Sequence, residues 1–130
     1  MPASTRPKVL LVEDEVTIST LLQEALAEAG FDVATAFNYH EAIAALDAHE
    51  GHLAGLITDV RIGAGGSGWD VARHARESAP TLPVVYTSGN SAHEWFVEGV
   101  PESVMVAKPF APAQIVVALA SLANRTDASD

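Results

Sequence analysis

The sequence contains no cysteine, which excludes disulfide bonds and metal sites built on thiolates and fits a reducing compartment. It also lacks an apolar stretch long enough to cross a bilayer. Ile115–Ala120 is among the longest and falls far short of the ~20 residues that a spanning helix needs. Met1–Lys8 has no apolar segment of the kind found in signal peptides. We therefore expect a soluble, cytoplasmic protein without a membrane segment.

Basic residues are scarce as well. Seven Lys and Arg stand against 17 Asp and Glu, which gives a formal net charge of −10. Because affinity for nucleic acid comes largely from Lys and Arg facing phosphates, this balance argues against direct nucleic-acid binding. The excess acid either keeps a small domain soluble or places carboxylates around a cation, and composition leaves both open. With 130 residues, 48% of them hydrophobic, the chain suffices for one domain with a core.

Two kinds of apolar pattern alternate along the chain. Val9–Val12 is a continuous apolar run, typical of a strand buried on both faces. From Ile18 to Ala29 apolar residues recur at helical spacing, and Gly30 can end that helix. The alternation continues to the end of the chain, so we predict an α/β fold whose parallel sheet has helices on both faces. The predicted strands are residues 9–12, 32–36, 56–59, 83–88 and 103–108.

Capping residues predict where several helices begin. Asn38 with Glu41, and Ser91 with Glu94, each have the spacing of a capping box. Ser67 is a suitable N-cap for the helix between the third and fourth strands. After Ser91 we expect two neighbouring aromatic residues to pack beneath the helix, the alternative being that one lies on a partner-binding face. These aromatic residues are Trp95 and Phe96.

Polar side chains stand where the predicted strands end. In open parallel sheets, ligands bind outside the carboxyl ends of the strands, near the point where strand order reverses. Glu13 and Asp14 follow the first strand, Asp59 ends the third, Ser88 the fourth and Lys108 the fifth. We therefore expect carboxylates, a hydroxyl and an amine to meet at one edge of the sheet.

This set of groups indicates phosphoryl chemistry. Carboxylates crowded together have raised pKa values unless a cation lies among them, and Mg²⁺ prefers such oxygen ligands. The set contains neither Cys nor His, which disfavours a softer metal. A carboxylate can attack phosphorus to form an acyl phosphate, whose charge Mg²⁺, Lys108 and the Ser88 hydroxyl would stabilise. The pattern predicts a site that receives a phosphoryl group on Asp59.

Four segments carry a resemblance to a known family: VLLVEDE, LITDV, PVVYTSG and VAKPF. Over roughly residues 8–124 their order and spacing resemble the response regulator receiver domains, the CheY-like family. The resemblance implies a flavodoxin-like sheet with strand order 2-1-3-4-5, and a two-component signalling protein. It implies no enzyme activity beyond self-phosphorylation from a donor and autodephosphorylation. The expected organisation is a flexible tail over 1–7, a receiver domain over 8–124 and a tail over 125–130.

The resemblance also implies individual roles around a Mg²⁺ ion. Asp59 matches the phosphoacceptor, which also contacts the metal, and Asp14 matches a direct metal ligand. Glu13 matches the acidic residue that precedes this ligand in the family and usually contacts the metal through water. The backbone carbonyl of Arg61 matches the third protein ligand. Lys108 matches the lysine of the family, in a bond to Pro109 that is typically cis in receivers.

Further residues correspond to positions that switch or tune receivers. Ser88, preferred to Thr87, matches the switch hydroxyl. Arg61 and Asn90 lie where receivers tune loss of the phosphoryl group, and whether Arg61 shields or pairs with the phosphate stays open. Met105 stands where the family usually has Tyr or Phe, so the usual aromatic readout is in question.

The implied phosphoryl donor is a histidine kinase or a histidine phosphotransfer protein. We expect a stand-alone receiver, because only residues 124–130 follow the last predicted helix. Such a receiver would signal through a separate target protein, with the fourth helix, fifth strand and fifth helix as the candidate face. Two alternatives stay open: a phosphorylation-independent binding module, and a receiver fragment of a longer hybrid kinase.

Other motifs are weaker. Gly63–Gly68 fits the G-x-G-x-x-G dinucleotide fingerprint, but it belongs to the third strand–helix unit. No acid stands about 20 positions later, where the chain reads Thr87–Gly89. We interpret these glycines as allowing a tight turn beside the acidic site.

Two further alternatives have little support. A phosphatase of the haloacid-dehalogenase kind usually has a second Asp where Arg61 stands. The five histidines are scattered along the chain and predict no zinc site.

Overall fold

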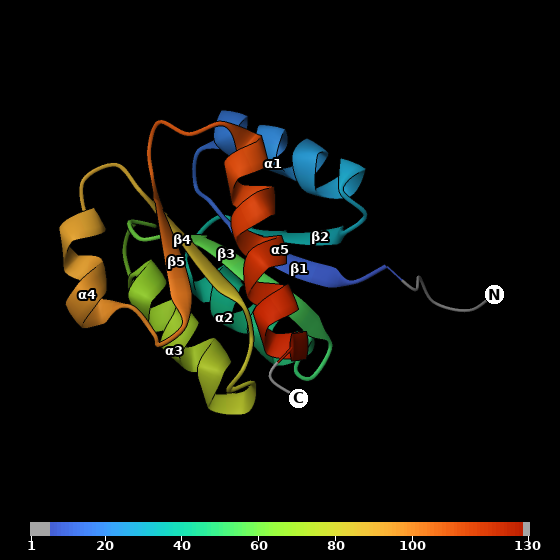
Figure 1. The fold of residues 1–130 in the computed structure, drawn as a ribbon. Coiled ribbons are helices and arrows are strands. Elements are labelled where there is room, and N and C mark those ends of the chain that lie inside the picture. Colours follow the sequence, from blue (N-terminus) through green and yellow to red (C-terminus); the bar gives the residue numbers. More distant parts are fainter. Residues whose placement is uncertain (1–5, 129–130) are drawn as a thin grey trace.

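The computed structural model describes residues 6–128 and has a parallel five-stranded sheet at its centre (Figure 1). The strand order is β2-β1-β3-β4-β5, which confirms the predicted order. The strands are β1 (Lys8–Val12), β2 (Asp32–Ala36), β3 (Leu53–Asp59), β4 (Val84–Ser88) and β5 (Ser103–Ala107).

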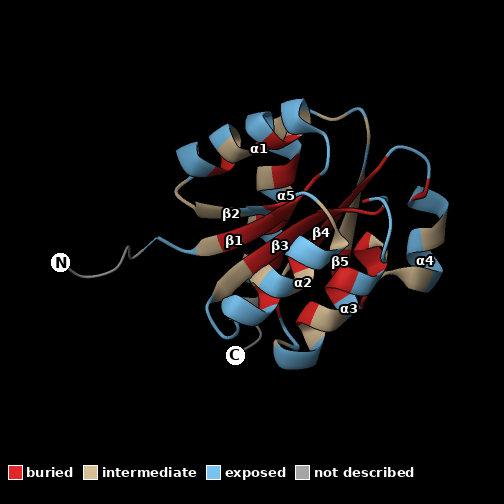
Figure 2. Ribbon diagram, turned by 180° about the vertical axis from the view of Figure 1, so that it is seen from behind, coloured by how far each residue is buried: buried red, intermediate tan, exposed pale blue. Residues whose placement is uncertain are grey.

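Helices cover both faces of this sheet, as predicted. They are α1 (Val16–Glu28), α2 (Tyr39–Ala48), α3 (Gly68–Ser78), α4 (Trp95–Glu98) and α5 (Pro112–Ala128), with a 3₁₀ turn over Ala92–Glu94 before α4. One apolar cluster joins the sheet to α2 and α3, and a second joins its other face to α1 and α5. The buried strands lie between outward-facing, exposed helix surfaces (Figure 2).

The first strand shows why the sequence folds in these layers. Successive side chains of a strand point to opposite faces, so Val9 and Leu11 pack toward α1 and α5 while Leu10 and Val12 pack toward α2 and α3. Burying a side chain of this size is worth roughly 1.5–3 kcal/mol. A strand covered on both faces therefore needs the continuous apolar run that predicted it.

The third strand begins earlier than the sequence predicts. It starts at Leu53 rather than at Leu56, because Leu53 and Gly55 pair with Lys8 and Val9 of β1. Gly55 also lies where α5 approaches closely. A Cβ at Gly55 would lie 2.6 Å from Cδ1 of Leu119. Glycine is unfavourable inside a strand by local propensity alone, so this contact from α5 was not visible in the local sequence.

The predicted caps differ in outcome. Ser67 forms a full capping box with Asp70, in which each side chain accepts from the other residue's backbone N–H. Asn38 accepts from the backbone N–H of Glu41 at 2.8 Å. The reciprocal bond reaches one residue further than predicted, because the Glu41 carboxylate accepts from the N–H of Phe37 instead.

The predicted capping box at Ser91 is wrong. Ser91 makes no side-chain capping bond, and a backbone φ of −113° with ψ of 9° places it outside the extended region that capping residues usually adopt. A short 3₁₀ turn follows instead of a regular helix, and the Ser91 hydroxyl bonds to groups of the functional site described below.

The ends of the domain extend beyond the predicted boundaries. Helix α5 runs to Ala128, past the expected end at residue 124. The Arg6 side chain donates to the carbonyls of Ala27 and Gly30, so this part of the expected flexible tail is held against the turn after α1. Residues 1–5 and 129–130 of the expected tails lie outside the described residues. No helix in the described range has the length and apolarity to cross a membrane.

Candidate functional site

The carboxyl ends of β1 and β3 bring three carboxylates together, as predicted. Glu13, Asp14 and Asp59 each offer an oxygen within 4.8 Å of the others, and we call these residues the carboxylate cluster. Because β1 and β3 are neighbours while β2 lies on the outer side of β1, the cluster stands at the point where strand order reverses.

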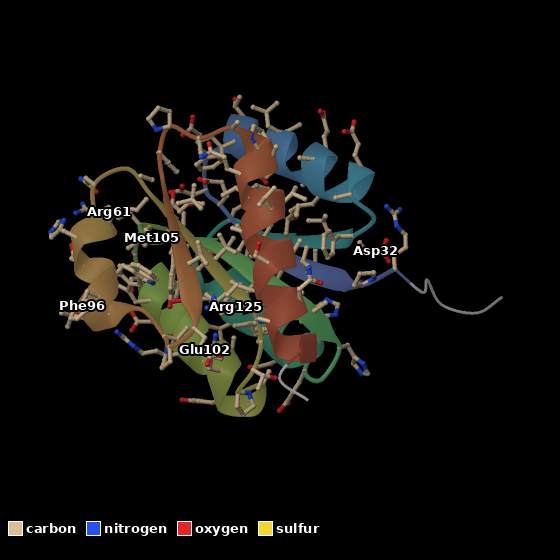
Figure 3. All side chains as sticks on the ribbon, viewed as in Figure 1. Asp32, Arg61, Phe96, Glu102, Met105 and Arg125 are labelled. Carbon is tan, nitrogen blue, oxygen red and sulfur yellow. The ribbon has the colours of Figure 1, made fainter. Side chains whose placement is uncertain are left out.

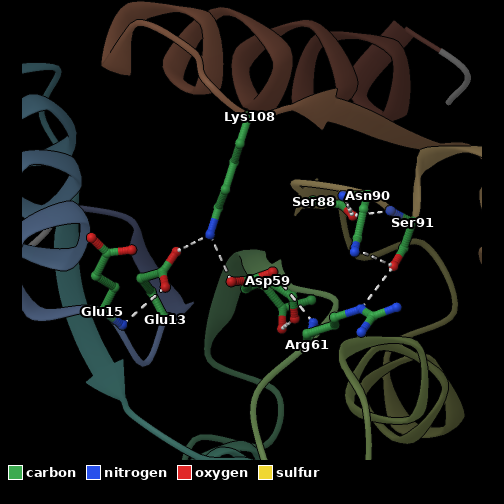
Figure 4. A network of polar contacts seen from close by, with 9 residues as sticks. Glu13, Glu15, Asp59, Arg61, Ser88, Asn90, Ser91 and Lys108 are labelled. Carbon is green, nitrogen blue, oxygen red and sulfur yellow. Dashed lines mark hydrogen bonds and ion pairs between the residues drawn. The ribbon is translucent and has the colours of Figure 1, made fainter.

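Lys108 enters this cluster from the end of β5 (Figure 4). Its Nζ lies 2.8 Å from Oδ2 of Asp59 and 3.3 Å from Oε1 of Glu13. Burial opposes the charged amine, but the hydrogen bond and charge of Asp59, together with the charge of Glu13, outweigh it and raise the pKa of Lys108. The Lys108–Pro109 bond is cis, as predicted.

Glu13 is the most deeply buried member of the carboxylate cluster, with 1% of its surface exposed. Burial raises the pKa of Glu13 to about 7, with the charge of Asp59 adding to the rise and the Glu15 amide and Lys108 opposing it. Its Oε2 accepts from the N–H of Glu15 at 3.0 Å. Its Oε1 faces Lys108 as an ion pair and makes no other polar contact within the described structure. A buried carboxylate that faces two others fits a hard cation.

The Ser88 hydroxyl lies at the end of β4, beside the cluster. It is buried and accepts from two backbone N–H groups, those of Asn90 at 3.2 Å and Ser91 at 2.6 Å. We call residues 89–91, which carry these amides, the β4–α4 loop. A hydroxyl that accepts two bonds still has its own proton to donate, so Ser88 can donate to a new acceptor at the site.

Arg61 contributes its backbone to the site and turns its side chain elsewhere. Its backbone N–H donates to Oδ1 of Asp59 at 3.3 Å. Its side-chain Nε donates to Oγ of Ser91, also at 3.3 Å, so the guanidinium reaches the β4–α4 loop (Figure 4). Ser91 was not predicted as a site residue, since its spacing to Glu94 was interpreted as a helix cap.

Met105 lies on β5 beside Tyr86 of β4 (Figure 3 labels Met105). It is half-buried and packs against the cluster of apolar residues under α2 and α3. The Tyr86 hydroxyl is buried and accepts from the N–H of Val100, and its ring packs edge-on to Trp69 at 4.6 Å between centroids. A buried aromatic pair therefore lies next to the position where the usual aromatic is missing.

The expectation that both aromatic residues of α4 pack inward is wrong for Phe96. Phe96 is 95% exposed (Figure 3), whereas Trp95 is 38% exposed and its indole N–H donates to the Ser103 hydroxyl. Trp95 is anchored toward β5, and the next residue of an α-helix lies about 100° further around the helix axis, so Phe96 points outward.

The glycine-rich loop after β3 forms a tight turn, in agreement with our interpretation. Gly63 and Gly65 have φ values of 85° and 102°, which favour glycine. A Cβ at Gly66 would lie 2.6 Å from the Tyr39 ring, and one at Gly68 would lie 2.1 Å from the carbonyl oxygen of Asp59. Close packing of the loop beside β3 accounts for these glycines.

A known protein family matches most of the chain. The response regulator receiver domain family matches residues 9–120. The chain belongs to this family. It is a receiver domain of the kind found in two-component response regulators, a signalling domain rather than a conventional enzyme, and the fold agrees.

Known receiver proteins resemble the chain over most of its length. A crystal structure of a response regulator receiver protein from Sinorhizobium medicae WSM419 is 38% identical with a TM-score of 0.88, over 92% of this chain and 96% of that one. SilR of Salmonella typhimurium, a probable transcriptional regulatory protein, is 32% identical over 91% of this chain and 51% of its own length. The transcriptional regulatory protein DctD of Rhizobium meliloti is 30% identical over 87% of this chain and 24% of its own. The chain thus spans a quarter to a half of these two curated relatives.

Two general properties of receiver domains bear on this site. Receiver domains bind Mg²⁺ at an acidic cluster and interact with histidine kinases or phosphotransfer proteins and with downstream effectors. The sequence-based roles of the individual residues of this receiver stay predictions, and the geometry above is the basis on which they are proposed.

Proposed function

We propose that this receiver accepts a phosphoryl group on Asp59 from a phosphorylated histidine of a histidine kinase or phosphotransfer protein. The observation that carries the proposal is the position of the Asp59 carboxylate. It belongs to the carboxylate cluster and is 6% exposed, and the Lys108 amine lies 2.8 Å away. A carboxylate held in this way is oriented for attack and has a cation beside it to offset incoming negative charge.

The transfer step balances without any further reactant. A carboxylate oxygen of Asp59 attacks the phosphorus, the bond between phosphorus and the donor nitrogen breaks, and its electron pair remains on the imidazole. The product is an acyl phosphate, which water later hydrolyses. Lys108 offsets charge on the phosphoryl oxygens. The Ser88 hydroxyl donates a hydrogen bond to one of them while its oxygen accepts from the amides of the β4–α4 loop.

The residues present fit a magnesium ion. We assign Asp14 and Asp59 as direct ligands with the backbone carbonyl of Arg61, and Glu13 as a neighbour acting through water. The mutual approach of the three carboxylates supports this assignment. When bound, Mg²⁺ would neutralise part of the charge of the transferring phosphoryl group. A magnesium ion is coordinated in the active-site cleft of the PA1611 receiver domain from Pseudomonas aeruginosa, which is 20% identical to this chain with a TM-score of 0.78.

The remaining assignments concern output. We infer a cytoplasmic receiver that signals through a separate target protein and does not itself contact nucleic acid. The candidate target face is that of α4, β5 and α5, where Phe96, Val97 and Val117 are exposed apolar side chains. Met105, Arg61 and Asn90 are assigned as residues that tune the response and the lifetime of the phosphoryl group. The intact site gives no support to a module that works without phosphorylation.

The test is intact-protein mass spectrometry after incubation with Mg²⁺ and a small-molecule phosphodonor such as acetyl phosphate. Wild type should gain the mass of one phosphoryl group, and Asp59→Asn should gain none. The matched control is Asp47→Asn, which removes a carboxylate from exposed α2 and should be labelled like wild type. Labelling of Asp59→Asn at the same site, or none of wild type in the presence of bound Mg²⁺, would contradict the proposal.

A further inference from the structure

Arg61 has an unexpected partner. It lies two residues after Asp59 and beside three carboxylates, yet within the described structure its side chain forms no ion pair with any of them. Lys108 alone supplies the ion pairs of the carboxylate cluster in that range. The guanidinium of Arg61 instead donates from Nε to a neutral hydroxyl, that of Ser91, at 3.3 Å.

Electrostatics alone would favour the opposite arrangement. A guanidinium is attracted to carboxylates, and its planar fork suits bidentate contact with them better than it suits a single hydroxyl. An arginine that turned back toward Asp59 would satisfy the same oxygens that a divalent cation needs. Something must therefore favour the outward position of the side chain.

Ser91 has the geometry to do this. It is 1% exposed, and its backbone N–H donates to the Ser88 hydroxyl at 2.6 Å, so its position is fixed against the end of β4. Its hydroxyl donates to Oδ1 of Asn90 at 3.3 Å, which leaves its lone pairs directed to accept from Arg61. Glu94 lines the same hollow as Arg61 and Ser91, so the displaced guanidinium keeps an acidic neighbour.

We propose that Ser91 is a positioning residue that holds the Arg61 side chain away from the carboxylate cluster and so keeps the cluster free for Mg²⁺. The inference deepens the proposed function and rests on it in one respect, namely that the cluster binds Mg²⁺. Loss of the Ser91 hydroxyl releases the guanidinium, which then competes with the metal for the carboxylates of the cluster.

The test is a cycle of two substitutions measured by calorimetric titration of the full chain with Mg²⁺. Ser91→Ala should weaken Mg²⁺ binding about two- to fivefold, the factor that a partly exposed ion pair typically supplies. Arg61→Ala keeps the backbone carbonyl, and its measured affinity is the reference for the double variant. The double variant should behave like Arg61→Ala, because no guanidinium remains to compete. Ser103→Ala is the matched control, since it removes a buried hydroxyl at the opposite end of β5.

Restored affinity in the double variant would support the inference, because a merely structural role of Ser91 would not be corrected by removing Arg61. Unchanged affinity in Ser91→Ala, or equal weakening in the double variant or in Ser103→Ala, would overturn it. Absence of Mg²⁺ binding in wild type would overturn both the metal site and this inference. Failure of wild type to be phosphorylated while it binds Mg²⁺ would count against the proposed function alone.

Discussion

The carboxylate cluster and the β4–α4 loop lie on opposite sides of the same site and are held in different ways. In the cluster, charged groups meet at the ends of β1, β3 and β5, and Lys108 contacts both Asp59 and Glu13. In the loop, neutral hydroxyl and amide groups bond to one another around Ser88 and Ser91. The carboxylate cluster therefore responds to a change of charge, whereas the β4–α4 loop responds by exchanging hydrogen bonds.

This difference indicates how a receiver can respond to one added group. New negative charge on Asp59 would interact directly with the charge of Lys108 and with that of a metal bound in the cluster. The loop carries no ionised side chain of its own among residues 89–91, and its contacts with the site are made by the Ser88 hydroxyl and the Arg61 guanidinium. The two sides can therefore be separated by substitutions that affect charge, packing or hydrogen bonding alone.

The largest expected effect is on the charged side. Asp14→Ala should weaken Mg²⁺ binding about a hundredfold, because groups that only support a metal ligand already contribute 10- to 100-fold. A calorimetric titration measures this directly. Glu15→Ala is the matched control, since Glu15 adjoins the same strand end and contributes only its backbone N–H to Glu13. Equal loss in the two variants would show that general negative charge, and not ligation, attracts the ion.

The backbone is packed more tightly at Gly68, beside Asp59, than at Gly89 in the β4–α4 loop. Gly68→Ala should lower the free energy of unfolding by about 2 kcal/mol, since the new Cβ would press on the Asp59 carbonyl oxygen and the backbone there must shift. Gly89→Ala in the β4–α4 loop is the matched control, because nothing lies within 4 Å of a Cβ at that position. Urea unfolding of both variants checks the comparison, and similar stabilities would contradict the tight contact at Gly68.

The charged side was predictable from the sequence, and the loop was not. Glu13, Asp59 and Lys108 each follow an apolar run that predicts a buried strand, and parallel strands bring their carboxyl ends to one edge. That reasoning needs only the order of the elements. The capping box at Ser67 was likewise predictable, because its two residues are close in sequence and their bonds are local.

Contacts between distant segments account for what the sequence did not predict. The hydroxyl of Ser91 bonds to Arg61, 30 residues away, so a local capping pattern predicted the wrong partner. The early start of β3 depends on its pairing with Lys8 and Val9 of β1. The outward position of Phe96 follows from the bond of Trp95 to Ser103, a residue outside the helix.

A third prediction concerns the buried charge of Glu13. Its pKa is raised from 4.5 to about 7 in the folded protein, so folding favours the protonated form. The contribution of protonated Glu13 to the free energy of unfolding is fully present below about pH 4.5 and is lost as the pH rises through about 7. Without Mg²⁺, Glu13→Gln should therefore gain stability relative to wild type as the pH rises from about 5 to about 8. Thermal unfolding at pH 5 and pH 8 checks this, and a gain equal at both pH values would argue against a buried charge as its cause.

The smallest expected effect is on the neutral side, and it tests whether the loop depends on one hydroxyl. Ser88→Ala leaves the N–H groups of Asn90 and Ser91 without their acceptor, and each such loss in a buried place is costly. Water can reach the partly buried Asn90 amide, so we expect a loss of about 1 kcal/mol in the free energy of unfolding. Ser88→Thr keeps the hydroxyl and is the control. Hydrogen exchange at the two amides resolves the cause: faster exchange in Ser88→Ala but not in Ser88→Thr would identify the hydroxyl as the group that orders the loop. Unchanged exchange in both would show that the loop is held by its backbone, and the contrast with the carboxylate cluster would then rest on charge alone.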